Sequence, residues 1–103
     1  MVHAISLSKE NRAKAQATTK AMENMGNIHI GHLIQVQLKA DKRSVGWLAK
    51  QIPCTRNHVY KIFNRPSLEA DLILKISVAL NFNFFRYYSA EFFEAMKARM
   101  GEE

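Results

Sequence analysis

The length of 103 residues allows one domain with a single modest core, and 48% of the residues are hydrophobic, which is enough for the chain to fold. No apolar run approaches the length of a membrane span, and the N-terminus lacks the unbroken apolar segment of a signal peptide, so we expect a cytoplasmic protein. The single cysteine, Cys54, excludes an internal disulfide framework and is expected to act as a small buried hydrophobe.

The formal net charge of +6 is unevenly distributed along the chain. Residues 1–27 carry a net +2, residues 28–88 a net +6 and residues 89–103 a net −2. No carboxylate occurs between Asp41 and Glu69, and the cations of that interval are Lys42, Arg43, Lys50, Arg56, Lys61 and Arg65. A solvated basic surface would also have this composition, but such a run is typical of a face that meets phosphates.

The first 27 residues differ in pattern from those that follow. Residues 1–27 contain few large apolar side chains, and a helix there would lack a packed face, so we expect a loosely structured arm. A core helix is predicted over 28–40, capped by Asn27, with an inward face of Ile30, Leu33, Ile34 and Leu38. His29 and His32 lie one turn apart, but no nearby ligand completes a metal site, so no metal is expected.

Two short helices are predicted within residues 44–64. Ser44 and Thr55, eleven residues apart, are each suited to cap a helix, and Pro53 stops the first helix near Gln51. The inward-facing apolar residues are Val45, Leu48, Ala49 and Ile52 on the first helix and Val59, Ile62 and Phe63 on the second. The alanine in this set leaves room for the helices to cross closely over a short turn.

The outer face of the second helix contains no acidic residue and consists of Arg56, Asn57, Tyr60, Lys61 and Asn64. These groups include several that form paired hydrogen bonds with base edges, so the pattern indicates a DNA-reading device. Trp47 is expected to pack its ring on the core rather than direct its indole N–H toward a phosphate. His58 is either a DNA contact, with an affinity that depends on its protonation, or an ordinary exposed histidine.

The stretch resembles the helix-turn-helix of the phage repressor and Cro family, also called the XRE family. The positions that match the family pattern are Leu48, Ala49, Ile52, Cys54, Thr55, Val59 and Ile62. A turn over 65–67 and the aliphatic helix after it are also similar, so the resemblance covers roughly residues 28–89. Pro53 stands at the turn position where the family usually has glycine.

The resemblance implies an all-α, five-helix lambda-repressor-like domain over 28–89 that binds double-stranded DNA sequence-specifically as a homodimer and acts as a small transcriptional regulator. The residues expected to read bases are Arg56, Asn57 and Lys61. Those expected to hold phosphates are Arg43, Ser44, Lys50, Thr55 and Asn64. Some members of the family use a basic arm on DNA, so residues 1–27 are either such an arm or an inert leader.

The remaining helices are rich in apolar side chains. Ser67 is expected to open a scaffold helix that ends at Asn81, and Asn83 to cap a short fifth helix. The aromatic residues Phe84, Phe85, Tyr87 and Tyr88 of this fifth helix either close the core or form a dimer contact. Ser89 then begins an added helix and tail over 90–103, which either folds back on its own domain or meets its mate in a dimer.

The sequence contains no catalytic constellation. It has no glycine-rich phosphate loop, no Ser-His-Asp or Cys-His grouping in a supporting context, and no distinctive carboxylate pair, so we expect neither an enzyme nor a cofactor. The alternative to DNA binding is a protein-interaction module on the same scaffold, such as the antitoxin half of a pair. That module would bind its partner with the aromatic surface of residues 84–100.

Overall fold

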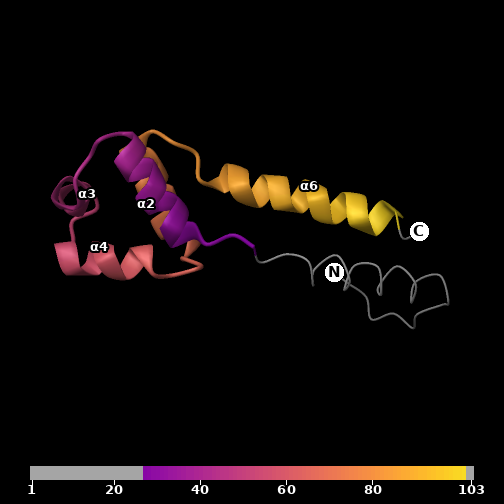
Figure 1. The fold of residues 1–103 in the computed structure, drawn as a ribbon, viewed down its shortest axis with the longest axis horizontal. Helices are drawn as coiled ribbons and strands as arrows, with labels where there is room; N and C mark the ends of the chain where they lie inside the picture. Colours follow the sequence, from indigo (N-terminus) through magenta and orange to yellow (C-terminus); the bar gives the residue numbers. More distant parts are fainter. Residues whose placement is uncertain (1–26, 102–103) are drawn as a thin grey trace. The chain divides into compact units, whose positions relative to one another are not determined.

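The computed structural model describes residues 27–101, so the predicted arm up to residue 26 and the last two residues lie outside the described part. Within 27–101 the chain forms five α-helices and no strand, which confirms the all-α class. The helices are α2 (Ile30–Ala40), α3 (Val45–Gln51), α4 (Arg56–Phe63), α5 (Ala70–Leu80) and α6 (Phe85–Gly101) (Figure 1). Residues Ile28–Tyr88 form one compact unit.

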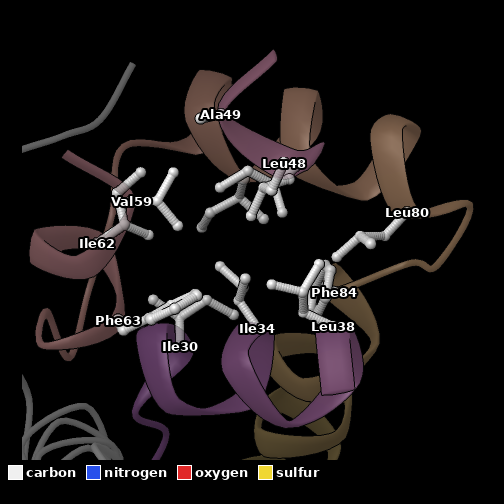
Figure 2. Packing of buried hydrophobic residues seen from close by; sticks show 12 residues of the cluster. Ile30, Ile34, Leu38, Leu48, Ala49, Val59, Ile62, Phe63, Leu80 and Phe84 are labelled. Atoms are coloured by element: carbon white, nitrogen blue, oxygen red, sulfur yellow. The ribbon is translucent and has the colours of Figure 1, made fainter. Parts of the chain in front are cut away.

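The core of this unit is made by the inward faces of α2 to α5. Figure 2 shows Ile30, Ile34 and Leu38 projecting from α2 toward the apolar side chains of α3 and α4. The other buried apolar residues are Leu48, Ala49, Val59, Ile62, Phe63, Ile73, Ile76, Leu80 and Phe84. Burying one such large side chain stabilises the fold by about 1.5–3 kcal/mol, so the helical spacing of these residues dictates which faces turn inward.

The first turn of α2 is capped two residues later than predicted. Asn27 was expected to be the cap, but His29 occupies that position, and its Nδ1 accepts a hydrogen bond of 3.0 Å from the backbone N–H of His32. The two rings lie edge to face with centroids 6.3 Å apart. This bond gives His29 a local role at the helix end, where free N–H groups need acceptors.

The segment after α4 supplies the other acceptors for the start of α2. The backbone N–H of Ile30 donates to the carbonyl of Pro66, and that of Gly31 to the carbonyl of Arg65, both at 3.0 Å. A Cβ on Gly31 would lie only 2.2 Å from the carbonyl oxygen of Ile62 and 2.7 Å from that of Arg65. Only glycine permits this approach of backbone to backbone.

The fourth predicted helix begins later than expected, because α5 starts at Ala70 rather than near Ser67. Residues 67–69 are non-helical, and Leu68 packs half-buried against the core. Glu69 stands at the N-cap without a side-chain capping bond, and its carboxylate instead pairs with Arg65 at 3.5 Å. The packing of Leu68 against the core therefore coincides with a helix start three residues later than the serine predicted.

A left-handed residue that is not glycine follows the Asp41 C-cap of α2, and another is the C-cap of α5. Lys42 has a φ of 57°, and the N–H groups of Lys42 and Arg43 donate to the carbonyls of Lys39 and Leu38, both at 3.0 Å. Asn81 ends α5 as predicted, with a φ of 51°. This arrangement satisfies carbonyl groups that would otherwise lack partners at a helix end.

The two C-terminal helices predicted from the sequence are one helix. Asn83 acts as expected at its start, since its Oδ1 accepts a hydrogen bond of 3.0 Å from the N–H of Phe85. Ser89, however, lies inside α6, which continues to Gly101. The prediction of a break was wrong because an internal serine costs only about 0.5 kcal/mol relative to alanine. A new helix boundary would leave several backbone groups without partners.

The aromatic residues around the start of α6 close the core, which was one of the two roles left open by the sequence. Phe84 is fully buried, and Phe82, Phe85, Tyr87 and Tyr88 pack half-buried against the core cluster. The buried Ser77 hydroxyl accepts a hydrogen bond of 3.2 Å from the N–H of Phe84, which joins α5 to this segment. Burial also raises the pKa of the Tyr88 phenol.

The part of α6 beyond Tyr88 exposes large apolar side chains. The exposed fractions are 56% for Phe92, 62% for Phe93 and 69% for Met100. The two phenyl rings contact each other with centroids 5.3 Å apart.

In the described part of the chain, no helix combines the length and the apolar character needed to cross a membrane.

Candidate nucleic-acid interface

The starts of α3 and α4 are fixed by the two predicted caps. Ser44 Oγ accepts a hydrogen bond of 3.0 Å from the backbone N–H of Trp47, and Thr55 Oγ1 accepts one of 3.0 Å from that of His58. Both cap residues have extended backbone geometry, as caps require. Each hydroxyl keeps its own proton to donate, so capping and phosphate binding by Ser44 or Thr55 are compatible.

The turn between α3 and α4 is short and contains no left-handed residue. Helix α3 ends at Gln51, and the N–H of Cys54 then donates to the carbonyl of Ala49 at 2.9 Å. Proline, which cannot adopt a left-handed conformation, is therefore compatible with this turn. In Figure 1 α3 is seen along its axis while α4 lies across the view, so the helices cross steeply. Buried Ala49 lies on the inner side of α3.

Cys54 in this turn is half-buried. Its Sγ donates a weak hydrogen bond to the carbonyl oxygen of Thr55 at 3.5 Å. Burial raises the pKa of the Cys54 thiol, so the neutral thiol predominates at pH 7 and is a poor nucleophile. The sequence predicted a buried small hydrophobe, and Cys54 does pack against the core cluster but is only partly buried.

Three polar side chains, two on α4 and one at its C-cap, lie opposite the buried face of α4. Val59, Ile62 and Phe63 of α4 are buried against the core. Asn57, Lys61 and Asn64 are exposed and follow one another at intervals of four and three residues. This spacing places them on one stripe that points away from the core. We call Asn57, Lys61 and Asn64 the outward stripe.

Arg56 lies apart from the outward stripe, although the sequence grouped it with Asn57 and Lys61. Its guanidinium lies against Gly46 in the first turn of α3, so closely that a Cβ on that glycine would be 2.8 Å from Nη2. The side chain therefore extends along the flank of α4 toward α3. The structure brings Asn57 and Lys61 together on one face and sets Arg56 beside them, between the two helices.

The other predicted phosphate contacts flank α3. Lys50 lies four residues after Gly46 and thus on the same side of α3 as the Arg56 guanidinium. The Arg43 guanidinium lies 4.5 Å from the centroid of the Trp47 ring, a cation–π arrangement that orients this cation. Trp47 is half-buried and packs against the core, as expected.

Among the described residues, no carboxylate forms an ion pair with Arg43, Lys50, Arg56 or Lys61. Helices α3 and α4 contain no acidic residue, and the ion pairs formed among the described residues are Arg65 with Glu69 and Lys97 with Glu94. Opposite charges nearby would reduce the attraction of this face for phosphates. The basic side chains of α3 and α4 therefore keep their positive field.

Two hollows of the compact unit lie outside the outward stripe. One, of about 390 Å³, is bordered by Gln37, Asp41, Arg43 and Trp47, and a more apolar one of about 830 Å³ lies between the α3–α4 turn and Leu74 of α5. Within residues 27–101, no three His, Cys, Asp or Glu side chains cluster so that they could hold a metal ion.

Sequence reasoning missed the part that two glycines play. Gly31 allows the contact between α2 and the end of α4, and Gly46 allows the contact between α3 and Arg56. A glycine inside a helix costs about 1 kcal/mol relative to alanine, so its presence there is a signal of close approach. That signal does not identify the group that approaches.

No protein-family model, curated protein or solved structure matches this chain. The described residues define an all-α protein in which two short capped helices cross over a short turn. Any functional assignment therefore depends on the geometry and charge of α3 and α4 and on the family resemblance of their sequence.

Proposed function

We propose that the chain binds double-stranded DNA sequence-specifically, with α4 in the major groove, and acts as a small transcriptional regulator. We also infer that α2 to α5 and the start of α6 correspond to a lambda-repressor-like domain of the phage repressor and Cro type. The observation that carries the proposal is the outward stripe, which presents two amides and an ammonium group with no carboxylate beside them.

The dimensions of α4 support this proposal. Its eight residues extend about 12 Å, and a helix of about 10–12 Å diameter fits the major groove, which is about 12 Å wide. Asn57 and Lys61 are separated by about 6 Å along the axis, which is close to two base-pair steps of about 3.4 Å. The amide of Asn57 suits adenine N6 and N7, and Lys61 suits guanine O6 and N7.

The residues around the stripe supply phosphate contacts in this proposal. Arg43 precedes the cap of α3 and Lys50 lies in its last turn, and Ser44 and Thr55 offer hydroxyl protons at the helix starts. Asn64 extends the outward stripe beyond the last residue of α4. Phosphate contacts fix the register of the helix, and the base contacts then discriminate sequence.

Selection of bound duplexes from a random pool tests the proposal. The purified full chain is incubated with the pool, and the enriched duplexes are sequenced. Because one α4 touches few base pairs, we expect a homodimer that enriches near-palindromes whose half-sites lie about 34 Å apart. A pool without enrichment would contradict sequence-specific binding, and a single unrepeated word with a monomer in light scattering would contradict the dimer.

The exposed part of α6 is the proposed source of the dimer. Deleting residues 90–103 removes Phe92, Phe93 and Met100, whose exposure motivates this assignment. We expect the truncated chain to remain folded by circular dichroism, to become monomeric in light scattering and to bind the selected duplex more weakly. An unfolded truncation would show instead that this segment is needed by the core.

The second candidate is a protein-interaction module, for example an antitoxin-like protein. The same exposed Phe92, Phe93 and Met100 favour it, because large exposed apolar side chains that gather on one helix are typical of interaction sites. The two functions use different surfaces. DNA binding depends on the outward stripe of α4, whereas partner binding depends on the second part of α6.

A further inference from the structure

Gly46 forms a seat for the guanidinium of Arg56. A Cβ at Gly46 would lie 2.8 Å from Nη2, 3.0 Å from Nε and 3.2 Å from Cζ of that side chain. These distances are shorter than ordinary contacts between carbon and a guanidinium. The guanidinium thus occupies the space that any other residue at position 46 would fill with its own side chain.

The three atoms nearest to a Cβ at position 46 all belong to the Arg56 side chain, which is long and flexible. Arg56 is exposed and is the first residue of α4, so its long side chain can swing away if the seat is filled. The helices themselves are held by buried Leu48, Ala49 and Val59, which are separate from this contact. A methyl group at position 46 should therefore displace Arg56 and leave the crossing of α3 and α4 intact.

A guanidinium that is already positioned loses less conformational entropy on binding than a free one. An arginine side chain carries about 2 kcal/mol of rotamer entropy, part of which is lost when the guanidinium becomes fixed on a ligand. Contact with Gly46 restricts the side chain before DNA arrives, so less entropy is lost on binding. Lys50, on the same side of α3, provides a second cation that favours an approaching phosphodiester chain.

We propose that Gly46 is a specificity-determining position: it seats Arg56 between α3 and α4 so that the guanidinium is oriented toward a guanine at the edge of the site read by the outward stripe. This inference rests on the proposed DNA binding. Arginine pairs with guanine through O6 and N7, so the seat contributes discrimination at one G·C pair. Gly46 itself is a positioning residue, which acts through Arg56.

A double-mutant cycle tests the seat. Gly46→Ala, Arg56→Ala and the double variant are titrated with the selected duplex, with duplexes changed at each G·C pair, and with a scrambled duplex. We expect Gly46→Ala to weaken binding to the selected duplex by about 3- to 10-fold and to relax discrimination at one G·C pair, with the scrambled duplex unaffected. In the Arg56→Ala background the same substitution should change nothing.

Gly101→Ala is the matched control, because a Cβ on that glycine would meet nothing within 4 Å. Circular dichroism and urea unfolding show that each variant is folded. The inference is overturned if Gly46→Ala weakens all duplexes equally, if its effect persists without Arg56, or if it leaves binding unchanged or tighter. It is also overturned if Arg56→Ala leaves binding to the selected duplex unchanged, while failure of the wild-type chain to select any duplex overturns the proposed function instead.

Discussion

Gly31 and Gly46 lie in the first turns of α2 and α3, and they face different kinds of atoms. A Cβ on Gly31 would lie within 2.7 Å of three backbone carbonyl oxygens, whereas the three atoms nearest to a Cβ on Gly46 all belong to the end of the Arg56 side chain. Carbonyls in a packed segment cannot move without the chain, while a guanidinium can. The contact between α2 and α4 is therefore rigid, and the contact between α3 and α4 leaves a movable cation beside the proposed DNA face.

This difference shows how one residue type serves two purposes in the same small domain. At the first contact glycine allows hydrogen bonds from Ile30 and Gly31 to the segment after α4, which hold the scaffold together. At the second contact glycine leaves room for a charged side chain at the surface. Substitution of Gly31 should thus change folding stability, and substitution of Gly46 should change DNA recognition.

The largest expected effect is that of Gly31→Ala. The added methyl group would overlap backbone carbonyls, so α2 and the segment after α4 must separate, and we expect the free energy of unfolding to fall by about 3 kcal/mol or more. Urea unfolding monitored by circular dichroism measures this change. If Gly31→Ala unfolded at the same urea concentration as the wild type, the close backbone contact would not exist in solution.

Lys42→Gly tests the left-handed backbone geometry of the connection between α2 and α3. Lys42 has a φ of 57°, a conformation that costs an L-residue about 1–2 kcal/mol, part of which is offset by the greater unfolded-state entropy of glycine. We expect unfolding to require about 0.5–1 kcal/mol more. Lys39→Gly removes the same charge inside α2 and should instead destabilise. Equal effects from both variants would contradict the left-handed end of α2.

Gly46→Ala should have a small effect on stability in contrast to Gly31→Ala. The methyl group displaces only the Arg56 guanidinium, and alanine favours the helix, so we expect the free energy of unfolding to stay equal or to rise by about 0.5 kcal/mol. Thermal unfolding followed by circular dichroism measures it. A loss as large as that of Gly31→Ala would mean that the two contacts do not differ in kind.

The smallest expected effect comes from Glu69. Its own backbone N–H and the Arg65 guanidinium lower the pKa of the Glu69 carboxyl from the ordinary value of 4.5. The folded state therefore favours the ionised carboxylate of Glu69. The contribution of Glu69 to the free energy of unfolding is fully present above pH 4.5, and it is lost as the pH falls through the lowered pKa that Glu69 has in the folded chain. Glu69→Gln should be slightly less stable than wild type at pH 7 and equal to it at strongly acid pH. Glu91→Gln is the control. A stability difference between Glu69→Gln and wild type that did not change with pH would show that the ionised carboxylate is not its cause.

Local signals predicted most of the fold. Ser44 and Thr55 cap helices through bonds to the residues three positions on, and Pro53 stops α3 because it has no N–H to donate. Helical spacing predicted most of the buried residues, but Leu33 of α2, which was expected to face inward, is not part of the core cluster. The errors arose where distant segments intervene. Carbonyls at Arg65 and Pro66 help to fix the start of α2, and the packing of residue 68 delays α5.

In the candidate site, the sequence predicted the residues whose position depends on α4 alone but not the contact with α3. Periodicity alone places Asn57 and Lys61 opposite Val59, and both are exposed in the structure. The position of Arg56 depends on a contact with α3 that no spacing within α4 encodes. Gly46 gave a signal of close approach, but only the three-dimensional arrangement identifies its neighbour.

The central claim is that the outward stripe of α4 reads DNA, and it is tested most directly by Asn57→Ala compared with Lys50→Ala. Each variant is titrated with the selected and the scrambled duplex at several salt concentrations, with Gln51→Ala as a control. Asn57→Ala should cost about 1–3 kcal/mol on the selected duplex and little on the scrambled one. Lys50→Ala should weaken both duplexes and reduce the salt slope by about 1.

Unchanged affinity of folded Asn57→Ala for the selected duplex would contradict the account. Helix α4 would then not be the reading element, and the protein-interaction module would explain the molecule better. The account predicts the opposite result: loss of affinity confined to the selected duplex, with discrimination relaxed at one base position.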